Sequence, residues 1–232
     1  MNTAIIVAAG SGQRFGQEPK QFADLLGKPL IIHTLDRFQA CPEIDGIVLV
    51  LSEDGRRYFD QIKSQFEISN LKFVITGGKT RAESVKNGLK AIVANDDDIV
   101  VIHDGARPLV SVDEIGRTIA KAKETGAACL VADVTDTIKE IDGEFISGTM
   151  DRNRLRRALT PQAFRYDILK RALEGVDLTD SITDECYLVE RLEVKIALVE
   201  GSARNIKITR SEDLILAKAY LSNTEDKPRM HE

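Results

Sequence analysis

A glycine-rich segment near the start of the chain combines small residues with two cationic side chains. It reads Ala8-Ala9-Gly10-Ser11-Gly12-Gln13-Arg14 and is followed by Lys20. Small residues let backbone N–H groups approach an anion closely, and successive N–H groups form a nest that favours negative charge. With Arg14 and Lys20 added, the segment suits the three linked phosphates of a nucleoside triphosphate. The loop alone leaves open the alternative of a glycine-rich turn that binds nothing.

Two better-known phosphate-binding loops do not fit this sequence. The dinucleotide-binding fingerprint G-x-G-x-x-G needs glycine where the chain has Phe15. The stretch Gly77-Gly78-Lys79-Thr80 ends like a Walker A loop, but the first glycine of that motif would fall at Phe73. The first mismatch counts against a nicotinamide-dependent oxidoreductase, the rival function that a strand followed by a glycine loop suggests.

A second polar cluster, His103-Asp104-Gly105-Ala106-Arg107-Pro108, directly follows an apolar run. Mg²⁺ prefers one or two carboxylates together with phosphate oxygens, so Asp104 is a candidate ligand for Mg²⁺ or another divalent cation. The structural alternative for Asp104 is a turn cap, because aspartate before glycine is common in turns. His103 ends the apolar run and is interpreted as a packed histidine. Arg107 is a candidate binding residue, because an arginine in such a loop has little structural purpose.

Short β-branched runs alternate with segments of helical period along most of the chain. Strands are expected at 3–9, 46–51, 72–76, 99–103 and 127–133, and helices at 30–39, 56–66, 81–93 and 111–125. Gly126 is expected to end the last of these helices. The apolar runs at 5–7 and 99–102 lack alternation, as in parallel strands that are covered on both faces. This order predicts an α/β fold with a doubly wound, mostly parallel sheet, whose ligand lies beyond the carboxyl ends of the strands.

The alternation of strands and helices breaks between about 135 and 159. Gly143 and Gly148 lie there among alternating residues, a pattern that predicts a β-hairpin arm projecting from the sheet. Beyond the arm, helices are expected at 165–173, 184–191 and 211–221, and a strand at 195–199. Residues 223–232 are expected to form a disordered tail. We therefore interpret residues 1–222 as one domain with an inserted arm.

The composition excludes several classes of protein. The chain has 232 residues, 43% of them hydrophobic, which suffices for one large α/β domain. Its formal net charge of −5 argues against a nucleic-acid partner. The three cysteines, Cys41, Cys129 and Cys186, are widely separated, which argues against a disulfide framework and a structural zinc site. There is no signal-peptide pattern and no apolar run near the ~20 residues of a membrane span, so we expect a cytoplasmic protein with no membrane contact.

Four further polar stretches lie in the predicted arm and after it. They are Asp136-Thr137, Asp151-Arg152-Asn153, Leu159-Thr160-Pro161-Gln162 and Asn205-Ile206-Lys207-Ile208-Thr209. Each alone is more often ordinary loop chemistry than a functional site. Their value lies in their order along the chain together with the two clusters described above.

In that order, the stretches resemble the 2-C-methyl-D-erythritol 4-phosphate cytidylyltransferases of the non-mevalonate isoprenoid pathway. The matching pieces also include Pro19-Lys20-Gln21, Gly77-Gly78, Arg81, Ser84-Val85, Thr183-Asp184-Glu185 and Val199-Glu200-Gly201. The likeness runs from residue 3 to about 221, and the ordered set is specific although each member is weak. Ribitol 5-phosphate cytidylyltransferases share most of this scaffold, but Asp151-Arg152-Asn153 and Thr183-Asp184-Glu185 look more like the methylerythritol family.

The resemblance implies a Rossmann-like nucleotidyltransferase that moves CMP from CTP to a small sugar or polyol phosphate. It assigns nucleotide binding to Ala8, Ala9, Gly10, Gly12, Gly78, Ser84, Asp104 and Gly105. It places Arg14, Lys20 and Lys207 around the triphosphate and the reacting phosphorus, and Mg²⁺ at Asp104. Acceptor binding falls to Arg107, Thr137, Arg152 and Thr160. In this family the arm crosses to a partner subunit, which implies a homodimer with composite sites.

Two rivals remain beside this reading. A non-catalytic nucleotide-binding protein on the same scaffold would be expected to lose Lys20, Arg14 or Asp104, and all three are present. A related enzyme that uses UTP or GTP would be separated by pyrophosphate release measured across four nucleotides. The stretch Lys79-Thr80 departs from some relatives of the resembled family, in which it is acidic, so no nucleotide contact is assigned to it. No general base is required, since an acceptor phosphate monoester with a second pKa near ~6 is already a nucleophile at pH 7.

Overall fold

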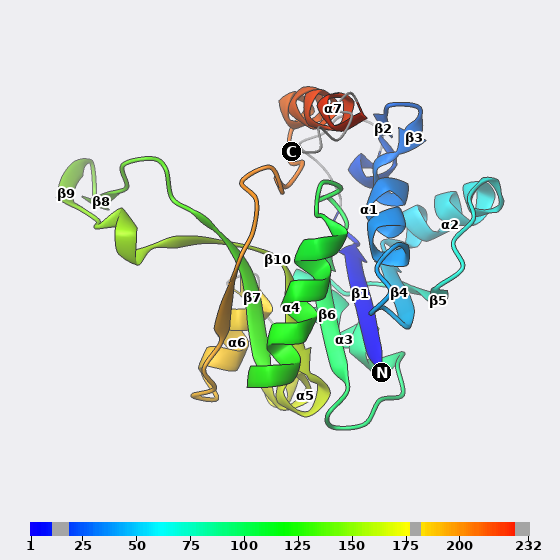
Figure 1. The fold of residues 1–232 in the computed structure, drawn as a ribbon, viewed down its shortest axis with the longest axis horizontal. Coiled ribbons are helices and arrows are strands. Elements are labelled where there is room, and N and C mark those ends of the chain that lie inside the picture. Colours follow the sequence, from blue (N-terminus) through cyan, green and yellow to red (C-terminus); the bar gives the residue numbers. More distant parts are fainter. Residues whose placement is uncertain (11–18, 177–181, 226–232) are drawn as a thin grey trace, which may run out of the picture.

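Seven strands form the central sheet of this protein, in the order β11-β7-β10-β6-β1-β4-β5 (Figure 1). The computed structural model describes residues 1–10, 19–176 and 182–225. The strands are β1 (Asn2–Ala8), β4 (Gly46–Leu51), β5 (Leu71–Thr76), β6 (Ile99–Asp104), β7 (Ala127–Asp133), β10 (Arg156–Arg165) and β11 (Ala197–Glu200). All neighbours pair in parallel except β10, which is antiparallel to both β6 and β7. The predicted α/β fold with a mostly parallel sheet is confirmed.

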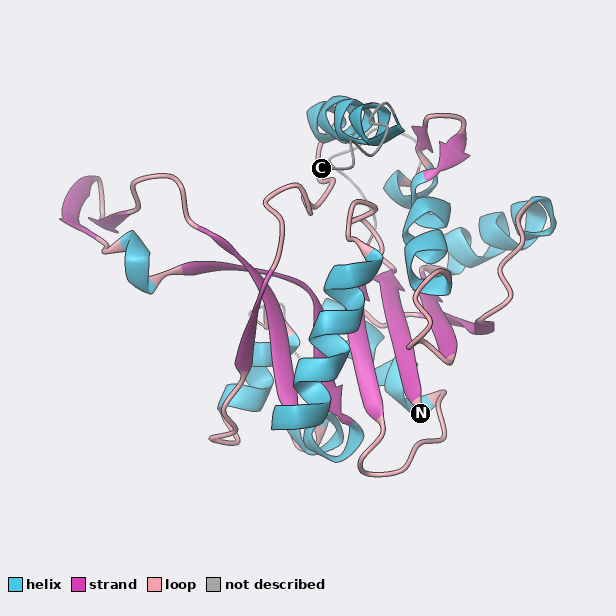
Figure 2. Cartoon of the chain, in the orientation of Figure 1, coloured by secondary structure: helices cyan, strands magenta, loops and turns pink. Residues whose placement is uncertain are grey.

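Helices cover both faces of this sheet (Figure 2). One face packs against α1 (Leu30–Gln39), α2 (Glu53–Ile62) and α4 (Val112–Thr125). The other packs against α3 (Arg81–Lys90), α5 (Tyr166–Leu173) and α6 (Glu185–Glu190). Ala4 and Ile6 of β1 enter the first core and Ile5 enters the second, which explains why the sequence of this strand shows no alternation. Gly126 ends α4 with a φ of +87°, as the sequence predicts.

The strand β10 was not predicted, and it lies in the middle of the sheet. Residues 159–162 were interpreted as a polar loop. A proline has no N–H for a strand ladder, so Pro161 is unusual in a central strand. In the structure, the pairing of β10 with β7 shifts register between Ala158 and Gln162. This irregularity accommodates the proline. Because β10 runs antiparallel to both of its neighbours, the sheet is mixed and mostly parallel.

The arm extends away from the body of the molecule (Figure 1). Its hairpin consists of β8 (Lys139–Asp142) and β9 (Phe145–Thr149), which pair with each other and form a separate sheet. A short 3-10 turn, η3 (Arg152–Arg154), leads from the hairpin into β10. The chain that leaves the arm therefore continues directly into the centre of the main sheet.

Three smaller elements surround the carboxyl ends of β1 and β6. The turn η1 (Lys20–Phe22) is followed by a minimal hairpin of β2 (Asp24–Leu25) and β3 (Lys28–Pro29). The helix α7 (Ser211–Glu225) packs on this hairpin through a small apolar cluster that includes Leu25, Ile208 and Ala217. The turn η2 (Lys63–Gln65) extends α2 on the far side.

Within the described ranges, every helix is too short or too polar to span a membrane.

Candidate active site

A cavity of about 380 Å³ opens at the carboxyl ends of β1 and β6. Its wall is built from the end of β1, the turn η1, the start of α3, the end of β6 and the segment before α7. The lining residues are Val7, Ala8, Ala9, Gly10, Lys20, Gln21, Gly78, Lys79, Thr80, Arg81, Ser84, Asp104, Ala106, Lys207 and Thr209. This is the edge of the sheet at which the sequence places the ligand, and its volume is that of a small-molecule site.

Most of the residues predicted to bind the nucleotide, and two of the three predicted to be catalytic, Lys20 and Lys207, meet in this cavity. Those that line it are Ala8, Ala9, Gly10, Lys20, Gly78, Ser84, Asp104 and Lys207. Gly12 and Arg14 lie outside the described residues. Gly105 is next to the cavity but serves packing, because a Cβ there would lie 2.8 Å from the Ala8 Cβ and 2.8 Å from the Ile31 Cδ1. Its predicted contact with the nucleotide stays a prediction.

The loop between β5 and α3 brings a helix N-terminus to the cavity. A Cβ on Gly77 would lie 2.5 Å from the Ala9 Cβ, so only glycine lets this loop come so close to the end of β1. The Ser84 hydroxyl accepts from the Gly78 N–H at 3.0 Å and donates to the Thr80 carbonyl at 2.9 Å. Thr80 also caps α3 in a capping box with Glu83. The positive end of the helix dipole therefore faces the cavity, where it favours a bound anion.

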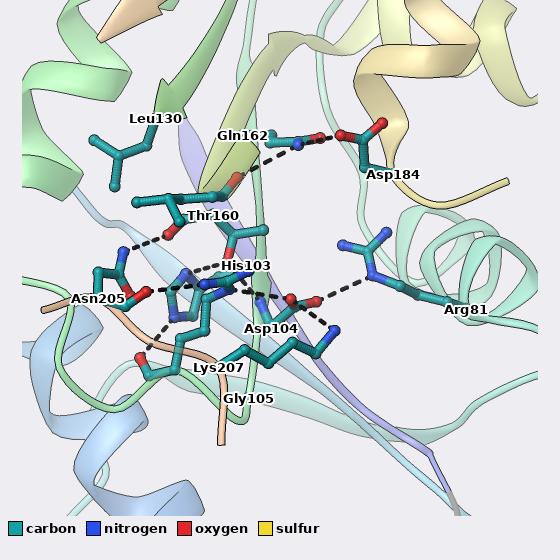
Figure 3. Close-up of polar contacts among 12 residues, drawn as sticks. Arg81, His103, Asp104, Gly105, Leu130, Thr160, Gln162, Asp184, Asn205 and Lys207 are labelled. Carbon is teal, nitrogen blue, oxygen red and sulfur yellow. Dashed lines mark hydrogen bonds and ion pairs between the residues drawn. The ribbon is translucent and has the colours of Figure 1, made fainter. Parts of the chain in front are cut away.

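Three cationic side chains surround the carboxylate of Asp104, and Figure 3 labels two of them, Arg81 and Lys207. Arg81 Nε lies 3.0 Å from Asp104 Oδ1, while Lys207 Nζ lies 3.0 Å and Arg107 Nε 3.3 Å from Oδ2. Burial alone would raise the pKa of Asp104, but the attraction of Arg81, Lys207 and Arg107 outweighs it and holds the pKa far below its usual range. Asp104 is therefore ionised at any working pH.

Arg81 and Glu185 belong to this site although the sequence analysis gave them no role. Arg81 Nη1 donates to both oxygens of Glu185, at 2.7 and 2.9 Å. Burial lowers the pKa of Arg81, but Glu185 and Asp104 overcome this effect and raise it. Both residues lie in stretches that match the family resemblance, and that match was the one available signal. Counting Arg107 and Lys207 as well, three cations face two carboxylates, so this cluster carries a net positive charge.

His103 is a packed histidine, as predicted, and its hydrogen bonds define its tautomer. His103 Nε2 lies 3.1 Å from the Arg107 carbonyl, which can only accept, so Nε2 carries the ring proton and donates to that carbonyl. Nδ1 therefore accepts from the Thr160 hydroxyl, 3.0 Å away, which itself accepts from the Asp104 N–H at 3.1 Å. Burial lowers the pKa of His103 to about 3. A neutral imidazole with both nitrogens occupied is not a general base.

Two predicted acceptor residues, Arg107 and Thr160, lie behind the cavity wall. Arg107 donates from Nη1 to the Asn205 carbonyl at 2.9 Å, in addition to its contact with Asp104. Thr160 is buried and ties the end of β6 to β10 through the bonds just described. Asn205 joins them, because its Nδ2 donates to the Thr160 carbonyl at 2.9 Å. These residues hold Asp104 and the segment that carries Lys207 in place.

The other two predicted acceptor residues lie on the arm. Arg152 is exposed and donates from Nη1 to the Thr135 carbonyl at 2.8 Å, and Thr137 is exposed as well. Neither lines the cavity of its own chain. Their predicted contact with the acceptor stays a prediction.

Among the described residues that line the cavity, Asp104 supplies the one carboxylate that a metal ion would find. No group of three or more His, Cys, Asp or Glu side chains suited to a metal occurs within the described ranges. Both oxygens of Asp104 already contact cationic groups. Mg²⁺ commonly takes one protein carboxylate and obtains its other ligands from substrate phosphates and water. The residues present therefore fit a metal that arrives with a phosphate chain, and they do not form a metal site by themselves.

Comparisons with known proteins agree with this geometry. Residues 2–223 match the family model of 2-C-methyl-D-erythritol 4-phosphate cytidylyltransferase (IspD). The enzyme of that name from Syntrophus aciditrophicus is 42% identical over 226 residues, which cover 96% of each chain. The one from Dehalococcoides mccartyi is 41% identical over 94% of this chain and 95% of its own. The crystal structure of 4-diphosphocytidyl-2C-methyl-D-erythritol synthase from Anaerococcus prevotii superposes with a TM-score of 0.83 at 32% identity, over 95% of this chain and 96% of that one.

Proposed function

Because this chain belongs to the 2-C-methyl-D-erythritol 4-phosphate cytidylyltransferase family, we propose that its cavity binds CTP beside the acceptor and that Lys20, Arg81 and Lys207 act on the phosphates. The enzyme transfers CMP from CTP to 2-C-methyl-D-erythritol 4-phosphate and releases pyrophosphate. The observation that carries the proposal is the cationic cluster around Asp104 in a cavity that a helix N-terminus also faces. A site of this kind suits two phosphate-bearing reactants.

The reaction is an in-line displacement at the α-phosphorus of CTP. A phosphate oxygen of the acceptor forms the new bond to this phosphorus, and the bond to the bridging oxygen of the β-phosphate breaks. Pyrophosphate leaves with the electron pair of that bond. Negative charge grows on the α-phosphate oxygens meanwhile, and fixed cations stabilise it without reorganisation. We assign this task to Lys207 and Lys20, both of which line the cavity.

A divalent cation, Mg²⁺ in the first instance, completes the proposed site. Asp104 is the residue that would offer it a ligand, and the phosphates of CTP would supply others. When bound, such an ion neutralises part of the charge on the triphosphate and makes the approach of a second anion easier. Arg14 lies outside the described residues, and its contact with the triphosphate stays a prediction.

We further propose that the enzyme is a homodimer that assembles through its arm. The support is the surface of the hairpin, where Ile141 is 71% exposed, Phe145 78% and Ile146 66%. Apolar side chains exposed together on a projecting hairpin indicate a protein interface. An arm that crosses to the partner would carry Arg152 and Thr137 to the acceptor end of the partner's cavity. The cytoplasmic location and the acceptor contacts stay predictions.

Pyrophosphate release tests the proposed function. The purified enzyme is supplied with Mg²⁺, with CTP, UTP, GTP or ATP, and with either 2-C-methyl-D-erythritol 4-phosphate or ribitol 5-phosphate. Release is expected with CTP and the methylerythritol acceptor. Equal release with all four nucleotides, or faster release with ribitol 5-phosphate, would contradict the proposal.

A further inference from the structure

Glu185 is a buried carboxylate whose ionic partner lines the active cavity. Its side chain is fully buried, and both of its oxygens accept from Arg81 Nη1, at 2.7 and 2.9 Å. The same guanidinium donates from Nε to Asp104 Oδ1 at 3.0 Å. Glu185 itself does not line the cavity. Arg81 therefore stands between the carboxylate of Asp104 inside the cavity, a contact that Figure 3 shows, and the carboxylate of Glu185 behind it.

The backbone of Glu185 is fixed as firmly as its side chain. Gln162 Oε1, on β10, accepts from the N–H groups of Glu185 and Cys186, each at 3.2 Å. Gln162 Nε2 donates to Asp184 Oδ2 at 3.0 Å, and Asp184 caps the same helix turn. The start of α6 is thus joined to the central sheet, so Glu185 presents its carboxylate to Arg81 from a rigid support.

Burial of the Glu185 carboxylate costs stability. Its contact with Arg81 suggests why a carboxylate is nevertheless present at this position. Burial raises the pKa of Glu185, and Arg81 only partly opposes that shift. Buried ion pairs stabilise a fold little compared with apolar residues of the same size, and they set the geometry of polar groups instead. Arg81 has a long side chain that could adopt many rotamers at the cavity wall. Two carboxylates, one on each side, restrict its guanidinium to one orientation.

We propose that Glu185 is a positioning residue for CMP transfer, and that it acts only through Arg81. The proposal rests on the proposed function of the cavity. Held by Glu185, Arg81 stays against Asp104 and keeps that carboxylate in line with Lys207. Without the charge of Glu185, Arg81 turns out of this position, and the cationic groups are no longer aligned with the phosphates. A displacement of about 1 Å in such a group can cost roughly 100-fold in rate.

A double-mutant cycle tests this proposal. The variants are Glu185→Gln, Arg81→Gln and the two combined, and kcat and KM for CTP are measured by pyrophosphate release. We expect Glu185→Gln alone to lower kcat/KM by about 10- to 100-fold. In the Arg81→Gln background the same change should add less than about a twofold loss, since its target is already absent. Independent losses that multiply in the double variant would overturn the proposal.

Three controls separate positioning from general destabilisation. Asp98→Asn removes an ion-paired carboxylate at the opposite end of β6 and should leave kcat/KM within about twofold of wild type. All assays are run at a temperature well below the lowest melting temperature measured for these variants, so that every enzyme is folded during the assay. If Glu185→Gln does not fold, Glu185→Asp replaces it, with a smaller loss that again vanishes in the Arg81→Gln background.

The outcomes distinguish this proposal from the proposed function. A wild-type enzyme that releases no pyrophosphate from CTP would overturn the proposed function and this proposal with it. An active wild type with an equally active Glu185→Gln variant would overturn the positioning role alone.

Discussion

Replacing Lys207 should change the reaction rate much more than the stability of the fold, because this residue lines the cavity but is not buried. Its Nζ lies 3.0 Å from Asp104 Oδ2, and 39% of its side chain is exposed. An ion pair of that exposure contributes about 1 kcal/mol or less to folding. In Lys207→Ala, Asp104 keeps Arg81 and Arg107 as partners. For a chain of this size, about 1 kcal/mol corresponds to a fall in melting temperature of roughly 2–4 °C.

The expected effect of Lys207→Ala on the reaction is much larger. A preorganised cation aimed at charge that develops in the transition state is worth roughly 3–4 kcal/mol, which corresponds to about 100- to 1,000-fold in kcat. The measurement is pyrophosphate release at saturating CTP and acceptor, with a thermal melt of each variant. Lys207→Arg keeps the charge and should recover part of the loss.

A matched control is available on α7. Lys218 has a similar exposure, 43%, and pairs with Asp24 at 4.0 Å, but it does not line the cavity. Lys218→Ala should leave kcat within about twofold of wild type and change the melting temperature by a similar small amount. A Lys207→Ala enzyme whose kcat stays within about threefold of wild type would refute the assignment of Lys207 to the reacting phosphorus.

Three other variants test separate parts of the account. Lys20→Ala should lower turnover at least about 100-fold with little change in melting temperature, and an active variant would refute its role. His103 has a folded pKa of about 3 against 6.5 for the free side chain, so the unfolded chain binds more protons between these values and stability falls as pH drops through that window. Between pH 7 and 4.5 the free energy of unfolding should fall by roughly 2–3 kcal/mol from this effect. Denaturant unfolding at both pH values should show a smaller fall for His103→Gln than for wild type. An equal fall in the two proteins would contradict the lowered pKa of His103. Phe145→Asp should shift the molar mass measured by light scattering from dimer towards monomer, and a monomeric wild type would contradict assembly through the arm.

The sequence predicts elements well where local rules and the final fold agree. The bounds of α1, β4 and β7 match their predictions, because each is a continuous apolar or amphipathic run. The start of α2 was placed three residues late, at Arg56, since Gly55 weakens a helical pattern. In the structure Ser52 caps the helix and accepts from the Gly55 N–H, which compensates for the glycine. Such a compensation is visible only once the cap geometry is known.

The candidate site likewise has a part that the sequence predicts and a part that it does not. The glycine loop follows β1 and Asp104 ends β6, two strands that were predicted, and a parallel sheet brings such ends together. Two of the three cationic partners of Asp104 could not be found by spacing, because Lys207 follows it by about one hundred residues and Arg81 lies on α3, outside the motif that contains Asp104. Glu185 meets Arg81 only because the unpredicted strand β10 holds the start of α6. Because β10 was not predicted, the contact between Glu185 and the Arg81 guanidinium could not be predicted either.

A carboxylate at the centre of a site for polyanions is at first sight unfavourable, because it repels the phosphates. The effect of this carboxylate on the neighbouring cationic side chains explains its presence. Arg81, Arg107 and Lys207 all lie within 3.3 Å of Asp104, and without a negative charge among them they would repel one another and turn towards water. Asp104 and Glu185 fix these cations before any ligand arrives, and the cluster still keeps a net positive charge. Stabilisation of a transition state by fixed charges depends on that prior order, because no rearrangement is then needed during the reaction.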